Sequence, residues 1–255
     1  MHIRPITRDD LPAIIAISVE AFGDDELNSW IFPHRKEYPG DFRKFLTTRL
    51  RQREAGLGQH GFVAVTEEGD ADWKGKCEVV GYAYFVRYGE DEGARKWKVE
   101  PWSNKLERKL LEWEAWYDST FIDRAMDPKR VLGFFKLLDW TQWDTLKSRW
   151  HVSILGVSPK YQRRGIGHML VQQGQKMAAE DGLPLTLESS AAGRRLYFRG
   201  GFKNVGEREV YAGYIDLLMV WEPEALRGKW LEEIEGNRAK VRTAEVAPVL
   251  HDRTR

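Results

Sequence analysis

The chain's residues 152–170 read VSILGVSPKYQRRGIGHML. An apolar, partly β-branched run ends at Ser158-Pro159, which predicts a strand followed by a turn. The basic segment KYQRRGIG then leads into a helical pattern. The N-terminus of a helix offers free N–H groups and a positive dipole, and side-chain-free glycines let a phosphate approach closely. The stretch therefore predicts a strand, an anion-binding turn for a di- or polyphosphate, and a helix.

Two motifs give the chain a family resemblance. Residues 162–167, QRRGIG, carry the pattern Q/R-x-x-G-x-G/A after a strand that ends in V-x-P, and this resembles motif A of the GCN5-related N-acetyltransferase (GNAT) family. Residues 196–202, LYFRGGF, resemble the family's second signature, L-Y-x-x-x-G-F. Two such motifs in this order and at the usual separation are more specific than either alone. The resemblance covers residues 150–210, with a looser fit over the first 88.

The resemblance implies an α/β (α+β) fold with a mixed, mostly antiparallel GNAT-type sheet of about seven strands flanked by helices. The first half of the chain agrees, because its patterns predict strand, helix, helix, strand and strand in the order with which this fold opens. The predicted strands are at 2–6, 62–66, 78–88, 152–157, 184–188, 202–205 and 210–221. The predicted helices cover 11–22, 42–56, a stretch that starts at the glycine turn and continues to 182, and a short segment from 189 to 198.

Residues 89–149 depart from the compact members of the family, in which a tight turn joins the third and fourth strands. Helical spacing predicts one long helix over 106–121 and a second over 131–143. Seven of the eleven tryptophans lie between Trp97 and Trp150. The insertion is interpreted as a helical element whose tryptophans pack a satellite core, or as a lid over the acceptor pocket, and the two are compatible.

These patterns predict a GNAT domain over residues 1–222 that includes the insertion. A C-terminal part over 223–255 is expected to hold one helical stretch, 226–234, and a loose tail. The segment 27–39, between the first two helices, is predicted to be irregular and to expose its aromatic residues.

Composition bounds the possible classes of protein. The chain has 255 residues, a formal net charge of +1, and 42% hydrophobic residues, which describes a globular protein with ample core material. The near-neutral charge argues against a nucleic-acid partner. The single cysteine, Cys77, excludes an internal disulfide and suits a reducing compartment. No stretch resembles a signal peptide or a membrane span, so the cytoplasm is the expected location, with no membrane partner.

Acetyl transfer from a thioester to an amine needs an acid for the departing thiolate. A thiol has a pKa of about 8.5 and tyrosine one of about 10, so tyrosine can supply this proton. By resemblance, Tyr197 occupies the family's general-acid position, and acetyl-CoA (coenzyme A) is the implied cofactor. The expected reaction is direct transfer of the acetyl group to a primary amine of a small molecule. The six histidines and single cysteine show no metal-ligand spacing, so no metal is expected.

The resemblance also assigns the cofactor groove. Backbone N–H groups of the turn are expected to bind the pyrophosphate, the glycines to avoid steric conflict, and the arginines to add positive charge. The backbone of the preceding strand, which bulges and splays from its neighbour in the family, is expected to pair with the pantetheine arm. The predicted cofactor-binding residues are Leu155, Gly156, Val157, Gln162, Arg163, Arg164, Gly165, Ile166, Gly167, His168 and Ser190. Ser189 and Ser190 stand where the family often has an asparagine, so the contact of Ser190 is a departure.

The base and the acceptor site carry no signature. A protonated amine must lose a proton before attack, either to a side chain or through water. Glu188, at the end of the fifth strand, and His151, at the start of the fourth, are candidates, and water is the third. Trp30, Phe32 and His34 are the candidate substrate-binding residues, and the oligomeric state stays open.

Three alternatives remain at this stage. Gly165-x-Gly167 with Glu188 about twenty residues later resembles a dinucleotide-binding unit, but Leu170 stands where the third glycine should be. A non-catalytic module that binds acyl-CoA would lack the acid, whereas Tyr197 is present. A protein or peptide acetyltransferase would need an open acceptor groove, whereas the Trp-rich insertion favours an enclosed pocket for an aromatic or apolar amine.

Overall fold

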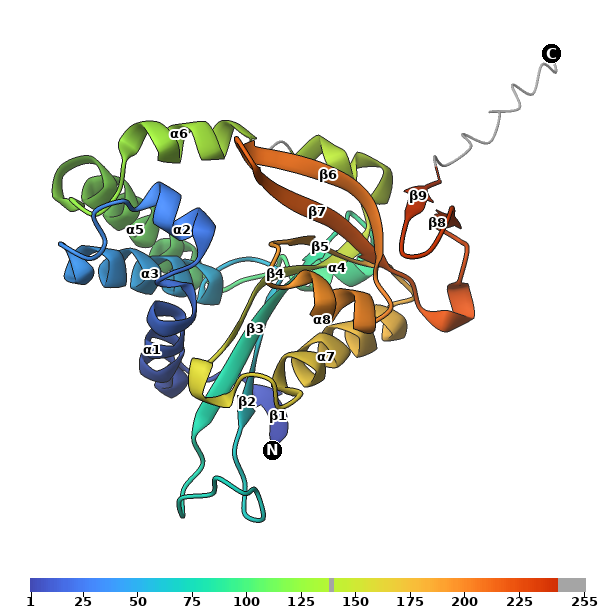
Figure 1. The fold of residues 1–255 in the computed structure, drawn as a ribbon, viewed down its shortest axis with the longest axis horizontal. Helices are drawn as coiled ribbons and strands as arrows, with labels where there is room; N and C mark the ends of the chain where they lie inside the picture. Colours follow the sequence, from blue (N-terminus) through green and yellow to red (C-terminus); the bar gives the residue numbers. More distant parts are fainter. Residues whose placement is uncertain (138–139, 243–255) are drawn as a thin grey trace.

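The structure is a computed structural model that describes residues 1–137 and 140–242. Its main sheet has seven strands in the order β1-β2-β3-β4-β5-β7-β6 (Figure 1). Every neighbouring pair is antiparallel except β4 and β5, which are parallel. The strands are β1 (His2–Pro5), β2 (Gln59–Val65), β3 (Val79–Tyr88), β4 (Arg149–Val157), β5 (Leu185–Ser189), β6 (Lys203–Tyr211) and β7 (Tyr214–Trp221). The predicted mixed, mostly antiparallel sheet of about seven strands is confirmed.

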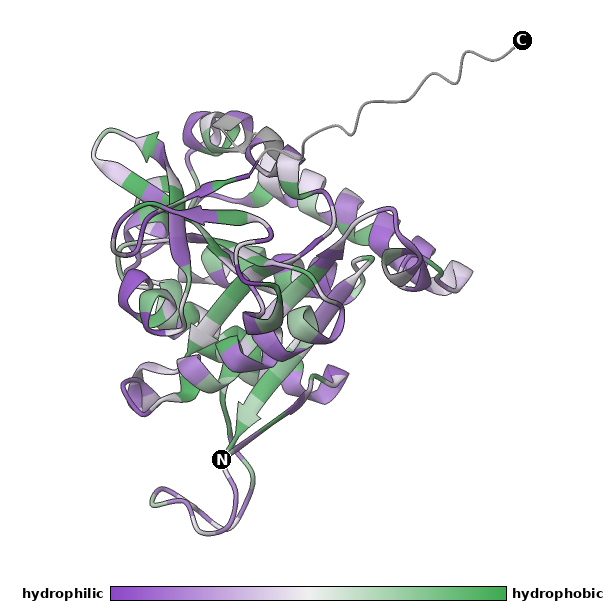
Figure 2. Ribbon diagram, turned by 90° about the vertical axis from the view of Figure 1, so that its right-hand side faces the viewer, coloured by the Kyte–Doolittle hydropathy of each residue, from purple (hydrophilic) through white to green (hydrophobic). Residues whose placement is uncertain are grey.

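Helices cover both faces of this sheet (Figure 1). One face carries α1 (Leu11–Phe22) and α3 (Pro39–Glu54), with α2 (Glu26–Ile31) between them in the sequence; the other carries α7 (Ile166–Glu180) and α8 (Arg194–Arg199). The side chains of β3 alternate between the two cores, because Tyr82 and Tyr84 pack under α1 while Ala83 and Phe85 pack under α7. Figure 2 shows the apolar residues concentrated on the central strands and the hydrophilic ones on helix surfaces and loops.

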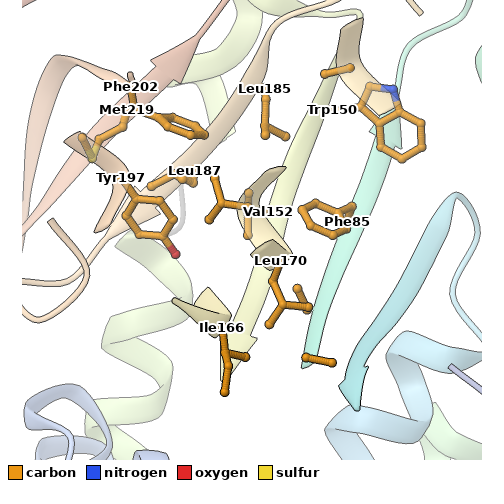
Figure 3. Packing of buried hydrophobic residues seen from close by; sticks show 14 of the residues in the cluster. Phe85, Trp150, Val152, Ile166, Leu170, Leu185, Leu187, Tyr197, Phe202 and Met219 are labelled. Carbon is orange, nitrogen blue, oxygen red and sulfur yellow. The ribbon is translucent and has the colours of Figure 1, made fainter. Parts of the chain in front are cut away.

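The helix α7 packs directly on the sheet. Its buried residues Ile166, Leu170, Val171 and Ala178 recur at helical spacing and pack on the centre of the largest core (Figure 3). Gly174 belongs to the same face, and a Cβ atom there would collide with the ring of Phe85. The glycine therefore allows the helix that follows the motif A turn to sit directly on β3.

The helical insertion between β3 and β4 is confirmed, but its tryptophans do not form a satellite core. It contains α4 (Glu92–Lys96), α5 (Trp102–Tyr117), a π-helical turn (Asp118–Ile122), α6 (Pro128–Leu137) and a 3₁₀ segment (Trp140–Leu146). Trp97, Trp102, Trp113 and Trp116 are all at least half exposed, from 50% to 78%. Leu111 is the one buried residue of α5, so this helix packs on α3 by a narrow edge. Trp143, by contrast, is buried.

The predicted helix over 226–234 is wrong. The structure has a short 3₁₀ turn (Glu224–Leu226) and then a hairpin of β8 (Leu231–Glu233) and β9 (Ala239–Val241). Gly228 has a left-handed φ of +80°, and the Glu222 carboxylate accepts hydrogen bonds from the backbone of Gly228, Trp230 and Leu231. These contacts bind the chain into a turn, and burial of Leu231 fixes the hairpin. The predicted loose tail, 243–255, lies outside the described residues.

Smaller differences concern segment ends. The predicted irregular segment 27–39 includes the short helix α2, and within it Ile31 and Phe32 are buried instead of exposed. The short helix predicted from residue 189 begins five residues later, at Arg194, and β6 extends to Tyr211. None of the helices in the described part of the chain is both long enough and apolar enough to cross a membrane.

Candidate active site

The parallel strands β4 and β5 separate soon after they begin. They pair only at Trp150 with Leu185 and at His151 with Thr186. On its other side β4 has a bulge, because Ile154 pairs with Tyr84 and Val152 with Phe85, which leaves Ser153 as an extra residue. The predicted bulge and splay of this strand are thus confirmed, and the β5-facing edge beyond His151 forms no ladder within the described residues.

A cavity of about 1400 Å³ opens along this separation. One end is formed by the backbone of Leu155, Gly156 and Val157 and by the turn before α7; the other reaches α2, α3 and α6. His151, Glu188, Ser190 and Tyr197 also line it. In Figure 3, Tyr197 lies beside Leu187 with its hydroxyl directed away from Met219 and Phe202. The cavity therefore brings together most of the residues that the two motifs nominated.

The motif A turn, residues 162–168, has the conformation that an anion site needs. Gln162 donates from Nε2 to the Val157 carbonyl at 3.1 Å, which ties the turn to the end of β4. Arg163 and Gly165 have left-handed φ values of +65° and +85°, and α7 begins at Ile166. Apart from its chain neighbours and its own helix backbone, no atom of the described residues lies within 4 Å of where a Gly165 Cβ would be. Open space in front of a helix N-terminus fits a pyrophosphate.

The side chains of the two arginines of this turn have different surroundings. Arg163 lines the cavity. The Arg164 guanidinium instead forms an ion pair with Asp72 and lies over the Tyr161 ring, 5.4 Å from its centroid. The β2–β3 loop thus supplies a carboxylate that competes for Arg164. Arg195 and Arg199 of α8, which the sequence reasoning missed, line the cavity as well.

Tyr197 comes from α8 and is only 8% exposed. Its ring packs edge-on against Phe202, and no hydrogen bond joins its hydroxyl to any of the described residues. Burial raises the pKa of Tyr197 to about 12. The phenol is therefore protonated at all ordinary pH values and is available to donate a hydrogen bond into the cavity.

Glu188 and His151 form an ion pair, and hydrogen-bond donors already surround the carboxylate. The Glu188 carboxylate faces Nε2 of His151 at 3.2 Å and accepts from Trp143 Nε1 at 2.8 Å and from Gln142 at 3.1 Å. Burial by itself raises the pKa of Glu188, but the charge and hydrogen bond of His151 and the bond from Trp143 outweigh it and lower the pKa to about 2. A carboxylate of this pKa is a weak base.

The hydrogen-bond network assigns the protons of His151. Thr186 Oγ1 donates to the Trp150 carbonyl at 3.2 Å, so its oxygen accepts from Nδ1 of His151 at 2.9 Å. The other ring nitrogen faces the ionised Glu188. Both ring nitrogens of His151 therefore already face a partner, Thr186 on one side and Glu188 on the other.

Of the three candidate substrate-binding residues, one lines the cavity and two do not. Phe32 lines the cavity. Trp30 stacks on Tyr211, with ring centroids 4.7 Å apart, and it is not among the residues lining the cavity. His34 is exposed and pairs with Glu37 at 3.7 Å, away from the cavity. Ser190 lines the cavity as expected, while Ser189 is buried.

Sequence reasoning missed most of the acceptor end of the cavity. Its polar wall is formed by Arg49, Arg53, Tyr88, Arg208, Tyr214 and Asp216, and its apolar wall includes Phe45, Val131 and Phe134. The sequence did contain one indication of a buried polar site. Arg49 and Arg53 share the helix face of Phe45 and Leu46. Basic residues on the apolar face of a helix are uncommon unless they serve a buried site.

Comparison with known proteins identifies the class. Residues 91–223, just over half of the chain, match the acetyltransferase (GNAT) domain family. The chain belongs to this family, as the two motifs predicted, and it is an acetyltransferase.

Relatives agree with this assignment. An uncharacterized N-acetyltransferase of Schizosaccharomyces pombe is 24% identical over 204 residues, which cover 78% of this chain and 80% of that protein. The fold is similar to a structure described as histone acetyltransferase HPA2 and related acetyltransferase from Corynebacterium glutamicum, with a TM-score of 0.53, 20% identity, and coverage of 87% of this chain and 96% of that one. A second structure, described as an acetyltransferase, has a TM-score of 0.50 and 20% identity, with coverage of 88% of this chain and 100% of that one.

Proposed function

We propose that the protein transfers the acetyl group of acetyl-CoA directly to the primary amine of a small molecule. The observation that carries this proposal is the meeting of three features in one cavity: the motif A turn, the separated edge of β4, and the phenol of Tyr197. Each feature alone occurs in proteins of other classes, but together they match the needs of a long phosphorylated thioester.

The residues present fit coenzyme A. The N–H groups at the start of α7 and the Arg163 side chain would bind the pyrophosphate, with Gly165 leaving room for it. The free edge of β4 at Leu155, Gly156 and Val157 would pair with the pantetheine arm as an added strand does. Acetyl-CoA supplies an activated acyl carbonyl and a thiolate leaving group.

Tyr197 would act as the general acid. The amine nitrogen attacks the thioester carbonyl, the carbon–sulfur bond breaks, and the phenolic proton passes to sulfur. Although burial raises the pKa of Tyr197 to about 12, the same apolar surroundings raise the pKa of a thiol that lies beside it, which keeps the transfer feasible. The phenolate then recovers a proton from water.

The acceptor's proton would leave through water. Of the candidate bases, Glu188 has a pKa of about 2 and accepts hydrogen bonds from Gln142 and Trp143, and the two ring nitrogens of His151 face Thr186 and Glu188. Neither side chain is placed to accept a proton from an ammonium group. The negative charge of Glu188 would instead attract the ammonium toward the separation of β4 and β5.

A small acceptor is supported by the apolar side chains that line the acceptor end of the cavity. Val131 and Phe134 of α6 and Phe32 after α2 line its acceptor end. Through α6 the insertion forms part of the cavity wall, whereas its exposed tryptophans on α5 lie outside this cavity. A lysine-containing peptide would need an open channel at this end.

The test is an assay of acetyl-CoA consumption across amines, run beside Tyr197→Phe. Loss of the acid is expected to lower kcat by about 100-fold or more, with acetyl-CoA affinity retained. Tyr117→Phe, which changes an exposed tyrosine of α5, is the matched control and should have wild-type turnover. Unchanged turnover of Tyr197→Phe at every pH removes Tyr197 from the mechanism. Absence of any affinity for coenzyme A in folded protein overturns the proposal as a whole.

A further inference from the structure

The acceptor end of the cavity is rich in arginine. Arg49 and Arg53 stand one turn apart on α3, and Arg208 comes from β6. All three line the same cavity, as do the carboxylates of Asp25, Glu188 and Asp216. The carboxylates of Glu188 and Asp216 already have partners in the cavity. Glu188 pairs with His151 at 3.2 Å, and Asp216 pairs with Arg208 at 3.3 Å. Neither pair involves Arg53.

Arg53 holds a desolvated charge without a carboxylate. Its Nε donates to Ser153 Oγ at 3.2 Å and its Nη1 to the Arg49 carbonyl at 3.4 Å. Both partners are neutral, and no carboxylate of the described residues lies within ion-pair distance. Burial accordingly lowers the pKa of Arg53, and only the tyrosines 82, 84 and 88 act in the opposite direction. A desolvated guanidinium of this kind is costly unless an anion joins it.

The neighbouring arginine strengthens the positive field. Arg49 donates from Nη1 to Gln52 Oε1 at 3.1 Å. Burial, and after it the charge of Arg53, lower the pKa of Arg49 to about 10. Two like charges on successive turns repel each other. An anion bound at the cavity face of α3 would relieve that repulsion.

Arg208 offers donors in the same cavity. One of its nitrogens, Nη2, pairs with Asp216, while Nε and Nη1 are buried and have no hydrogen-bond partner among the described residues. Buried donors are rarely left unsatisfied, and an absent ligand is a common reason when they are. The acceptor end thus presents guanidinium donors from both α3 and β6.

Apolar side chains surround these charges. Phe32, Phe45, Val131 and Phe134 line the cavity beside Arg49 and Arg53. A ligand that fills this end therefore needs a hydrophobic body as well as an anionic group.

We propose that the acceptor is an amino acid with an apolar side chain, and that Arg53 selects it by binding its carboxylate. This inference rests on the proposed acetyl transfer and names its substrate class. The guanidinium of Arg53 matches a carboxylate in charge and in planar geometry. The Glu188 carboxylate draws the ammonium group toward the separation of β4 and β5, while the phenylalanines contact the side chain.

The first experiment compares matched acceptors. L-Phenylalanine, L-phenylalaninamide and 2-phenylethylamine share one aromatic body, and only the first carries a carboxylate. We expect kcat/KM for acetylation to be at least about tenfold higher for phenylalanine. Equal or better use of the amide and the amine overturns the inference while leaving acetyl transfer intact.

Variants of α3 then assign the preference to Arg53. Arg53→Gln is expected to lower kcat/KM for phenylalanine about tenfold or more and to leave the value for the amide within about twofold. Arg53→Lys, which keeps the charge, should retain most of the preference. Arg51→Gln is the matched control, because Arg51 is on the same helix, pairs with Glu114 at 3.1 Å and does not line the cavity. A preference that survives in Arg53→Gln overturns the role of this residue.

A binding measurement separates this inference from the proposed function. Calorimetry with coenzyme A present would compare N-acetyl-L-phenylalanine with its amide, which needs no turnover. Stronger binding of the acid by wild-type protein, lost in Arg53→Gln, supports the carboxylate site even if no amine is acetylated. Equal binding of acid and amide, or binding of neither, overturns it even if amines are acetylated.

Discussion

The Nε2 atom of His151 lies 3.2 Å from Oε2 of Glu188, and this pair joins the insertion to the sheet. The other oxygen of Glu188 accepts from the side chains of Gln142 and Trp143, both of the 3₁₀ segment that ends the insertion. The pair therefore connects β4, β5 and the insertion at the point where the two strands separate. Its primary contribution is to hold the cavity open in one geometry and to place a fixed negative charge there.

The fixed charge should be visible as a pH-dependent stability. Because folding lowers the pKa of Glu188 from 4.5 to about 2, its contribution is present above pH 4.5 and is lost as the pH falls toward 2. Glu188→Gln is expected to reduce the free energy of unfolding by about 3 kcal/mol at pH 7, and the difference from wild type should shrink below pH 4.5. Urea unfolding at pH 7, 5 and 3 measures this. Glu224→Gln, at a 90% exposed carboxylate, is the control, and a difference as large at pH 3 as at pH 7 would contradict the assignment.

The two arginines of the motif A turn should behave differently. Arg163→Ala removes a cation from the cavity wall, so the Kd for coenzyme A is expected to rise by about tenfold. Arg164→Ala removes a partner of Asp72 instead and should change this Kd by less than about twofold. Titration calorimetry with coenzyme A measures both. Equal losses in the two variants would mean that Arg164 leaves Asp72 when the ligand binds.

A charge at Gly165 tests the phosphate site itself. Gly165→Glu places a carboxylate in front of α7, where it repels phosphate and occupies the open space. Coenzyme A affinity is expected to fall by about 100-fold or more, given two charged phosphates at close range. Gly236→Glu is the matched control, because Gly236 also has a left-handed φ, of +57°, with nothing within 4 Å, and it lies in the β8–β9 turn. It carries a similar backbone strain and the same charge, so a similar loss there would assign the effect to folding.

The parts of the fold that could be predicted are those with local signals. The motif A turn combines a strand end, two glycines and a helix start within a few residues, and Tyr197 is fixed by its distance from Gly201 and Phe202. The mostly antiparallel sheet of about seven strands followed from the resemblance that these motifs support. In each case the information lies within one short segment, so tertiary packing did not alter it.

The acceptor wall could not be predicted in the same way. Arg53 and Arg208 are separated by more than 150 residues of sequence and line one cavity only because α3 and β6 both face it. Trp30 and His34 are close to Phe32 in the chain, yet the helix α2 turns only Phe32 inward. The tryptophans of α5 were expected to pack in a core, but they are exposed. Helical spacing of apolar residues does not reveal whether another element covers them.

The C-terminal hairpin gives a last prediction, at the place where helical spacing was misleading. Leu231 is 4% exposed and packs with Trp143, Leu146 and Val220, whereas Ile234 is 68% exposed. Leu231→Ala is expected to lower the free energy of unfolding by about 2–4 kcal/mol, and Ile234→Ala by less than about 0.5 kcal/mol. Because Trp143 also donates to Glu188, loosening Leu231 should weaken the support of the cavity and raise the KM for the acceptor. Urea unfolding and acceptor kinetics of both variants measure this, and equal effects on stability would show that the hairpin is not part of the core around Trp143.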